Sequence, residues 1–315
     1  MKIAVVGAGA VGGYYGGMLS KAGLDVTFIA RGKHLEAMKH SGLHIHSLQD
    51  SFIAEGTFTN DLKKIKEADL LLFTVKSTET KETAETIRPL LKKDAAILTL
   101  QNGVDNEELL TNTLGSDRIV SGSSYISASV ERPGVIRQYS NLEKIIFGGL
   151  PETNSRHVES FVHVLQIANI DHEVSTSIIE KKWEKLLWNA TFNPLTAASS
   201  ASVGDVLDKK PLRRTAEAVL AEVVNVASGL GVNLNDSWVK QIFSLSEVAR
   251  NHKTSMLQDL EKGKKMEVES ICGYIIKKGK EVGIDTPVLE TIYAILCSIN
   301  DRIESKNTEK AYPSN

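Results

Sequence analysis

A glycine-rich motif within the first dozen residues constrains the fold of this chain more than any other feature. Residues 3–6 form a run of small and β-branched apolar side chains, typical of a strand buried on both faces of a parallel sheet. Gly7, Gly9 and Gly12 follow in the spacing G-x-G-x-x-G, and a helix is expected over 11–21. In this context the glycines allow a tight turn, close approach of a pyrophosphate, and helix packing on the strand. The motif predicts a dinucleotide site with its phosphates at a helix N-terminus, the alternative being a glycine-rich turn in another α/β fold.

The residues after the second predicted strand, 25–29, select the type of dinucleotide. An NAD site places a carboxylate there for the ribose, whereas an NADP site places cations near the 2′-phosphate. The chain has Arg31 and Lys33 at this point, and His34 as a further candidate charge. The first carboxylate after this strand is that of Glu36. Because a guanidinium matches phosphate oxygens bidentately, we predict NADP(H); the alternative is a solvated basic loop.

Alternating strand and helix patterns continue through the first half of the chain and predict a Rossmann-type sheet. Further helices are expected at 33–41, 79–91 and 156–167, and further strands at 42–47, 52–58, 69–75, 95–100, 119–128, 135–139 and 145–148. The first two of these strands are expected to form a hairpin, and the last two to be antiparallel strands joined by a polar turn. Lys76 and Asn102 each follow a buried strand, at the sheet edge where α/β proteins bind ligands.

Strand signals cease after residue 174, and the pattern becomes helical. We therefore predict an α/β dinucleotide-binding domain over residues 1–174 and an all-α substrate domain over 175–315. Helices of this second domain are expected at 177–196, 205–229, 236–248, 264–280 and 288–304, followed by a disordered tail from Ser305.

The first helix of the second domain carries a polar stripe. Lys185, Asn189 and Asn193 are four residues apart, so they share one helix face within an otherwise apolar stretch. Asparagine is a poor residue for a helix interior, and a buried polar stripe requires partners. The stripe indicates a site, the alternative being the exposed face of an amphipathic helix.

Composition excludes several classes of function. A formal net charge of −2, with 42% hydrophobic and 24% charged residues, gives no electrostatic reason for binding nucleic acid or a membrane. The chain starts with a core strand rather than a signal sequence, and we expect a cytoplasmic protein. The two cysteines, Cys272 and Cys297, are too few for a zinc site, and His44 and His46 lack a third ligand, so no metal is expected.

These motifs, in this order, resemble the ketopantoate reductases (2-dehydropantoate 2-reductases) over nearly the whole chain. The resemblance rests on residues 7–12, 75–76, 102–103, 183–189, 193–197 and 255–259, followed by Glu267. It implies NADPH-dependent reduction of 2-dehydropantoate, a small 2-keto acid, to (R)-pantoate in pantothenate and coenzyme A biosynthesis.

The resemblance also implies roles for individual residues. It makes Lys185 the general acid, which suits a lysine because its pKa can fall toward neutrality when it is partly buried. It places the 2-keto acid against Asn102, Asn189, Asn193 and Ser255. Together with the motif analysis it assigns to the dinucleotide site Gly7, Ala8, Gly9, Ala10, Val11, Gly12, Arg31, Lys76, Asn102, Ala128 and Glu267.

Two positions depart from the family pattern. Val203 stands where the family usually carries asparagine, and His252 stands where an asparagine is expected, three residues before Ser255. A second hypothesis is therefore the same chemistry on another branched or aromatic 2-keto acid. A third is a non-catalytic NADPH sensor, against which the intact polar stripe argues. The sequence leaves open the assembly, a homodimer included, and the strictness for NADPH over NADH.

Overall fold

The N-terminal motif folds as predicted. Strand β1, Lys2–Val6, enters the glycine turn and helix α1, Ala10–Lys21, leaves it. Strand β1 pairs in parallel with β2, Asp25–Ile29, on one side and with β6, Leu70–Phe73, on the other. A strand with parallel neighbours on both sides requires apolar residues on both faces, which explains the uninterrupted run of buried side chains in β1.

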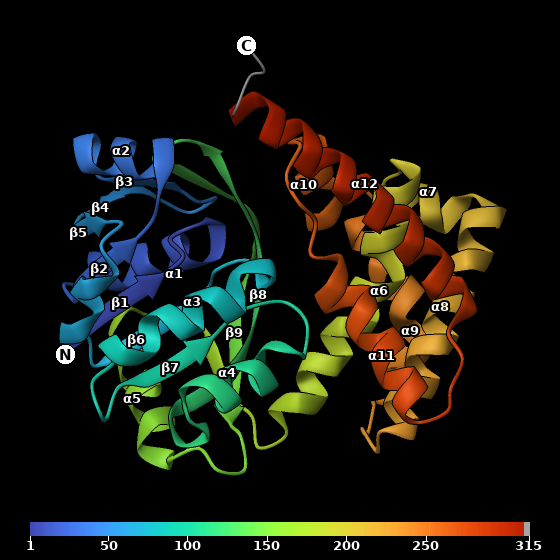
Figure 1. Cartoon of the computed structure of the whole chain (residues 1–315), viewed down its shortest axis with the longest axis horizontal. Coiled ribbons are helices and arrows are strands. Elements are labelled where there is room, and N and C mark those ends of the chain that lie inside the picture. Colours follow the sequence, from blue (N-terminus) through green and yellow to red (C-terminus); the bar gives the residue numbers. More distant parts are fainter. Residues whose placement is uncertain (252, 312–315) are drawn as a thin grey trace. The chain divides into compact units, whose positions relative to one another are not determined.

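A single sheet forms the centre of the N-terminal unit, Met1–Lys181 (Figure 1). Within residues 1–251 and 253–311, which the computed structural model describes, its order is β4-β3-β9-β8-β7-β6-β1-β2-β5, with β10 beside β9. The remaining strands are β3 Leu43–His46, β4 Ser51–Ala54, β5 Thr57–Thr59, β7 Ala96–Thr99, β8 Ile119–Arg132, β9 Val135–Gly149 and β10 His172–Val174. Strands β7, β6, β1 and β2 are parallel neighbours, so their carboxyl ends meet at one edge.

Helices cover both faces of this sheet. Ile3 and Val5 belong to the core cluster that contains residues of α1 and of α5, Ser155–Ile167. Ala4 and Val6 belong to a second cluster, with residues of α3, Thr80–Ile87, and α4, Asn106–Leu114. Short 3₁₀ turns flank these helices at Leu62–Glu67, Ser77–Glu79, Arg88–Leu90 and Ser116–Arg118, and α2, Gly32–Ser41, follows β2. The predicted Rossmann-type architecture is therefore confirmed.

Two strand predictions were wrong. Residues 52–58 form two strands: β4 pairs with β3 as the expected hairpin, but β5 pairs with β2 near the opposite edge. Gly56, with φ +152°, separates them, and a Cβ there would lie 2.5 Å from the Val26 carbonyl oxygen.

The expected turn between 135–139 and 145–148 is instead an irregularity within the single strand β9, which pairs with β8 on both sides of it. Polar composition alone does not distinguish a bulge from a turn.

The C-terminal unit, from Lys182 onward, consists of helices in the part of the chain that the structure describes. The helices are α6 Ile178–Ser199, α7 Val203–Asp208, α8 Lys210–Gly229, α9 Asp236–Leu245, α10 Ser255–Glu261, α11 Tyr274–Glu281 and α12 Pro287–Ala311, with a 3₁₀ turn at Ser246–Ala249 and a π-helical turn at Glu269–Gly273. Helix α6 begins in the N-terminal unit because Ile178, which is buried, packs on Gly148 of β9. The compact units therefore divide inside α6, after the expected change at residue 174.

Two expected helices and the expected disordered tail also needed correction. The predicted helix 205–229 is broken at Lys209, whose backbone is extended, because Pro211 near the start of α8 cannot donate to the preceding turn. Residues 264–267 are not helical as expected; helical structure begins only at Val268, immediately before the π-helical turn. The tail expected from Ser305 continues as helix α12 through Ala311, and residues 312–315 lie outside the described residues.

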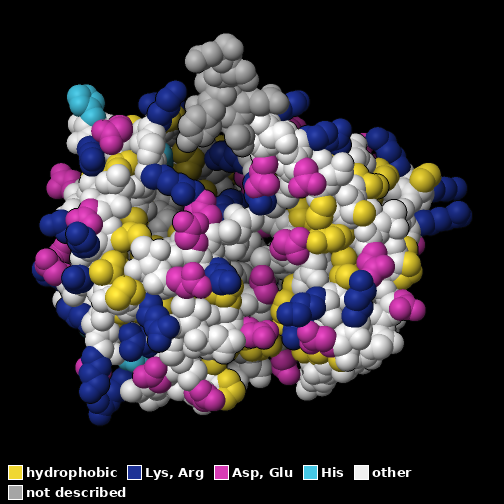
Figure 2. Space-filling model, in the orientation of Figure 1, with side chains coloured by type: hydrophobic (Ala, Val, Ile, Leu, Met, Phe, Trp, Pro, Cys, Tyr) yellow, Lys and Arg dark blue, Asp and Glu magenta, His cyan; other side chains and the backbone are white. Residues whose placement is uncertain are grey.

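Charged side chains of both signs lie on the molecular surface. On the face drawn in Figure 2, Lys and Arg side chains are interspersed with Asp and Glu, in keeping with the formal net charge of −2. Among residues 1–251 and 253–311, no helix combines the length and hydropathy that crossing a bilayer requires.

Glu222 of α8 caps the start of α12, and its removal is expected to destabilise the C-terminal unit. Its two carboxylate oxygens accept hydrogen bonds from the N–H groups of Val288 and Leu289, each at 2.9 Å. Glu222→Ala should lower the free energy of unfolding by about 2 kcal/mol, since two helix N-terminal donors lose a charged acceptor. Thermal denaturation measures this effect. Glu217→Ala is the control: it removes an exposed pair with Arg213 on the same helix and should cost about 0.5 kcal/mol or less. Equal losses would contradict the capping role.

Candidate functional site

Each glycine of the motif has its own structural reason. Gly7 has φ +100°, and a Cβ there would lie 2.6 Å from the Val75 nitrogen, so only glycine fits between β1 and the end of β6. A Cβ on Gly12 would collide with the Thr74 hydroxyl, which donates a hydrogen bond to the Gly7 carbonyl at 2.9 Å. A Cβ on Gly9, by contrast, would meet no atom within 4 Å. Gly9 thus borders open space at the start of α1.

The same turn leads into backbone donors. Ala10, Val11 and Gly12 are the first three residues of α1, whose N–H groups no intrahelical carbonyl can accept. The Ala8 N–H, by contrast, is used internally, donating to the Ile29 carbonyl at 2.9 Å. Free N–H groups and the positive end of the helix dipole fit the pyrophosphate of a dinucleotide.

His34 has a different role from the one expected. Its Nδ1 accepts a hydrogen bond from the Gly134 N–H at 3.0 Å, and its Nε2 lies 3.0 Å from the Ala8 carbonyl oxygen. Because the first partner can only donate and the second can only accept, the imidazole is the neutral tautomer with its proton on Nε2. His34 therefore supports the glycine turn instead of supplying charge for a phosphate.

Arg31 and Lys33 lie at the start of α2, after β2, as the sequence predicted. The Arg31 side chain is 78% exposed, and its guanidinium forms an ion pair with the Glu79 carboxylate. Glu79 ends the 3₁₀ turn that follows β6. A cation and an anion thus meet at the carboxyl ends of the two strands that flank β1.

A buried polar network joins the loops that carry Lys76 and Asn102. The Gln101 amide donates to the Val75 carbonyl at 2.9 Å and to the Thr80 hydroxyl at 2.7 Å. Thr80 donates to the Asn106 side chain at 2.8 Å, and Asn106 donates to the Asn102 carbonyl at 2.9 Å. The network fixes the backbone immediately before Lys76 and at Asn102, at the ends of neighbouring strands β6 and β7.

Ala128 is not at the ends of β6 and β7. It lies on β8, in the part of that strand that extends past its pairing with β7. Strand β8 pairs with β7 only over Ile119–Ser121 and then continues with β9 alone. Ala128, opposite Gln138 of β9, is partly buried and packs against the core cluster of α1.

In the C-terminal unit, the polar stripe on α6 is buried. Asn189 is 6% exposed and Asn193 is 1% exposed, and Lys185 is partly buried. The alternative of an exposed amphipathic face is therefore wrong. Burial, and after it repulsion from Lys182, lowers the pKa of Lys185 from 10.5 to about 8, against the attraction to Glu267, which acts in the opposite direction. The ammonium is thus tuned toward neutral pH.

Asn193 has an unusual environment. Its side-chain carbonyl oxygen is buried without a hydrogen-bond partner among the described residues, an arrangement that costs roughly 1–3 kcal/mol. Nearby, the Thr196 hydroxyl donates to the Asn193 backbone carbonyl at 3.1 Å and lies 2.8 Å from the Thr254 hydroxyl. Thr254 caps α10 and precedes Ser255. These contacts bring Ser255 to the same stretch of α6 as the stripe.

Glu267 is held from α12. The Asn300 amide accepts from the Met266 N–H at 3.0 Å and donates to the Met266 carbonyl at 3.1 Å, which fixes the backbone beside Glu267. Glu267 is 7% exposed and interacts electrostatically with Lys185. The structure therefore gathers Lys185, Asn189, Asn193, Ser255 and Glu267 within the C-terminal unit.

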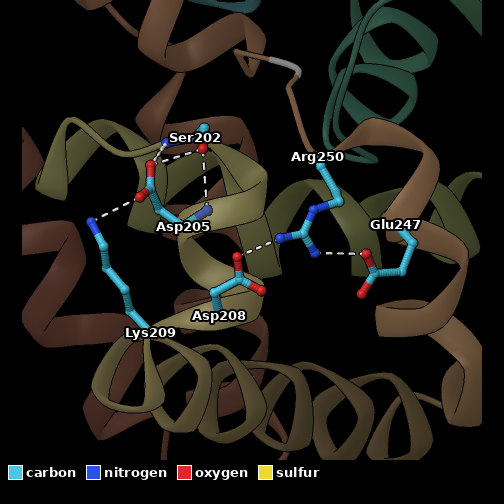
Figure 3. A network of polar contacts seen from close by, with 6 residues as sticks. All are labelled: Ser202, Asp205, Asp208, Lys209, Glu247 and Arg250. Atoms are coloured by element: carbon cyan, nitrogen blue, oxygen red, sulfur yellow. Dashed lines mark hydrogen bonds and ion pairs between the residues drawn. The ribbon is translucent and has the colours of Figure 1, made fainter.

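The departure at Val203 lies in a tightly held part of this unit. Val203 begins α7 and is fully buried. Figure 3 shows the contacts around this helix: Ser202 and Asp205 cap it reciprocally, and Arg250 bridges Asp208 and Glu247. The other departure, His252, lies outside the described residues.

Sequence analysis missed several residues that position the site: Thr74, Glu79, Thr80, Thr196, Thr254 and Asn300. Only a weak signal could have revealed them, namely polar residues within or beside apolar stretches. Their partners are distant in sequence; Thr196 and Thr254, for example, are 58 positions apart.

Comparisons with known proteins give matches along both units. The family model described as ketopantoate reductase PanE/ApbA matches residues 3–152, and the model of its C-terminal domain matches residues 177–300. A 2-dehydropantoate 2-reductase of Pyrococcus horikoshii is 31% identical over 94% of this chain and 96% of its own length. The crystal structure of a PanE/ApbA family ketopantoate reductase from Ralstonia eutropha superposes with a TM-score of 0.90 at 30% identity, covering 96% of this chain and 100% of that one.

A D-mandelate dehydrogenase, solved with NADH and anilino(oxo)acetate, has the same fold, with a TM-score of 0.88 at 23% identity over 96% of this chain and 99% of that one. That likeness concerns the fold alone. The two family models, by contrast, together cover the glycine turn that contains Gly7, Gly9 and Gly12 and the polar stripe on α6. The chain therefore belongs to the ketopantoate reductase family of oxidoreductases.

Proposed function

We propose that this chain reduces 2-dehydropantoate to (R)-pantoate with NADPH, a step of pantothenate and coenzyme A biosynthesis. The observation that carries the proposal is the buried α6 stripe, in which an ammonium of lowered pKa shares a helix face with two buried amides. The names of the relatives support the substrate. We place the reaction in the cytoplasm; the two free thiols, Cys272 and Cys297, are consistent with a reducing compartment.

The residues of the N-terminal unit fit NADPH. The open space at Gly9 and the first N–H groups of α1 suit the pyrophosphate, while Arg31 and Lys33 suit the 2′-phosphate. Lys76, Asn102 and Ala128 would hold the remainder of the dinucleotide. When bound, NADPH supplies the hydride.

The residues of the C-terminal unit would bind and protonate the 2-keto acid. Reduction of a ketone develops negative charge on its oxygen, which the Lys185 ammonium would stabilise and then neutralise by donating its proton. The unpartnered Asn193 carbonyl oxygen suits a hydroxyl donor of the substrate. Asn189 and Ser255 would orient the rest of the keto acid, and Glu267 would lie where hydroxyls of substrate and dinucleotide meet.

A second candidate is the same reaction on another branched or aromatic 2-keto acid. Val203, which replaces the expected asparagine with a buried apolar side chain, favours this alternative. A less polar pocket would accept an apolar substituent more readily than a hydroxymethyl group.

Turnover with a substrate panel tests the proposal. Oxidation of NADPH, followed by absorbance, should be fastest with 2-dehydropantoate and slower with pyruvate, 2-ketoisovalerate and benzoylformate. Faster turnover of 2-ketoisovalerate or benzoylformate would move the function to the second candidate. Binding of NADPH without turnover of any 2-keto acid would instead indicate a sensor.

A further inference from the structure

The cation expected to recognise a 2′-phosphate already has an anionic partner in this chain. Arg31 follows β2, Glu79 follows β6, and these strands are the two neighbours of β1, whose carboxyl end carries the glycine turn. The Arg31–Glu79 ion pair therefore lies beside the place where the adenosine ribose of a dinucleotide is expected.

NADPH and NADH would interact differently with the Arg31–Glu79 ion pair. The 2′-phosphate of NADPH carries between one and two negative charges, so it must compete with Glu79 for the guanidinium and is repelled by the carboxylate. NADH presents a neutral 2′-hydroxyl at the same point. A carboxylate accepts a hydrogen bond from that hydroxyl, as the acidic residue at the end of the second strand does in NAD sites.

We propose that Glu79 sets the dinucleotide preference of this enzyme: by holding Arg31, it reduces the advantage of NADPH and admits NADH to the same site. The inference rests on the proposed function only in assigning the dinucleotide to the glycine turn. It follows from two side chains of one compact unit, and it concerns binding rather than turnover.

Affinity measurements on the full-length protein test the proposal. Dissociation constants for NADPH and NADH, from nicotinamide fluorescence in the absence of any keto acid, are compared between the wild type and Glu79→Gln. Removing the carboxylate charge should tighten NADPH binding roughly tenfold at low ionic strength. Binding of NADH should stay the same or weaken. The ratio of the two constants therefore shifts toward NADPH.

Glu82→Gln is the matched control, because Glu82 is exposed in the first turn of α3 and its substitution removes the same charge without touching Arg31. It should change the ratio less than twofold. The proposal is overturned if Glu79→Gln weakens NADPH binding, leaves the ratio unchanged, or shifts it no more than Glu82→Gln does. Because no keto acid is present, a failure to reduce 2-dehydropantoate would refute the proposed substrate and leave this result intact.

Discussion

Replacing Lys185 with methionine is expected to lower kcat for 2-keto acid reduction by about 10²–10⁴, the usual contribution of a general acid. The NADPH dissociation constant should stay unchanged, because the residues that fit its pyrophosphate and 2′-phosphate belong to the N-terminal unit. Stopped-flow and steady-state measurements of NADPH oxidation give both quantities. Lys240→Met, at an exposed position of α9, is the control and should retain wild-type turnover. A Lys185→Met enzyme with undiminished kcat would remove Lys185 from the mechanism.

The same substitution should stabilise the protein at neutral pH, which separates loss of chemistry from loss of folding. The pKa of Lys185 is about 8 in the folded chain, below its ordinary value of 10.5. Below pH 8 the folded state must therefore keep an ammonium that its surroundings disfavour. This destabilisation disappears as the pH rises from 8 to 10.5, where only the unfolded chain retains the proton. Thermal denaturation at pH 7 should show a higher Tm for Lys185→Met than for the wild type.

The pH dependence of reduction follows from the same pKa. Lys185 must be protonated to donate, so kcat/KM for reduction should fall about tenfold per pH unit above pH 8. Lys182 contributes to the lowered pKa, so Lys182→Gln should move the break to higher pH. A profile that stays flat between pH 7 and 10 would contradict the assigned role.

The sequence predicts those site residues that belong to a motif with regular spacing. It does not predict features that depend on contacts with residues distant in the chain. The G-x-G-x-x-G turn and the α6 stripe are periodic, so the sequence placed Gly7, Lys185 and Asn193 on the correct elements. The burial that distinguishes the stripe from a solvated helix face comes from neighbouring helices, which spacing does not reveal. The orphaned oxygen of Asn193 is likewise visible only once its surroundings are assembled.

Errors in the predicted fold have the same origin. The polar stretch within β9 resembles a turn locally, but pairing with β8 on both sides keeps it in one strand. His34 was a candidate cation by position, whereas Gly134, 100 positions away, holds it neutral. Arg31 was placed correctly, but its partner Glu79 is 48 positions away and comes from a different strand end. Partners that are distant in the sequence thus determine the pairing of β9 and the environments of His34 and Arg31, which the local sequence pattern does not reveal.

Substituting alanine for Gly7 is expected to disrupt both folding and dinucleotide binding. The added Cβ would lie 2.6 Å from the Val75 nitrogen and 2.8 Å from the Thr74 carbonyl carbon, both backbone atoms that cannot turn aside, at a φ of +100°. Such strain should cost at least about 2–4 kcal/mol of unfolding free energy. Thermal denaturation measures the cost. A Gly7→Ala protein as stable as the wild type would show that the turn has more room than its geometry indicates.

Alanine at Gly9 should separate binding from folding. A Cβ there would meet no protein atom within 4 Å, and the backbone is extended, so the Tm should change little. The methyl group would nevertheless occupy the space in front of the first N–H groups of α1. A pyrophosphate bound there would be displaced, and NADPH affinity should fall by roughly tenfold or more. Fluorescence titration with NADPH measures this loss. Unlike Gly7 and Gly12, Gly9 has open space beside it, so an added methyl group there can disturb only a bound molecule. Wild-type NADPH affinity in Gly9→Ala would therefore mean that the phosphates bind elsewhere.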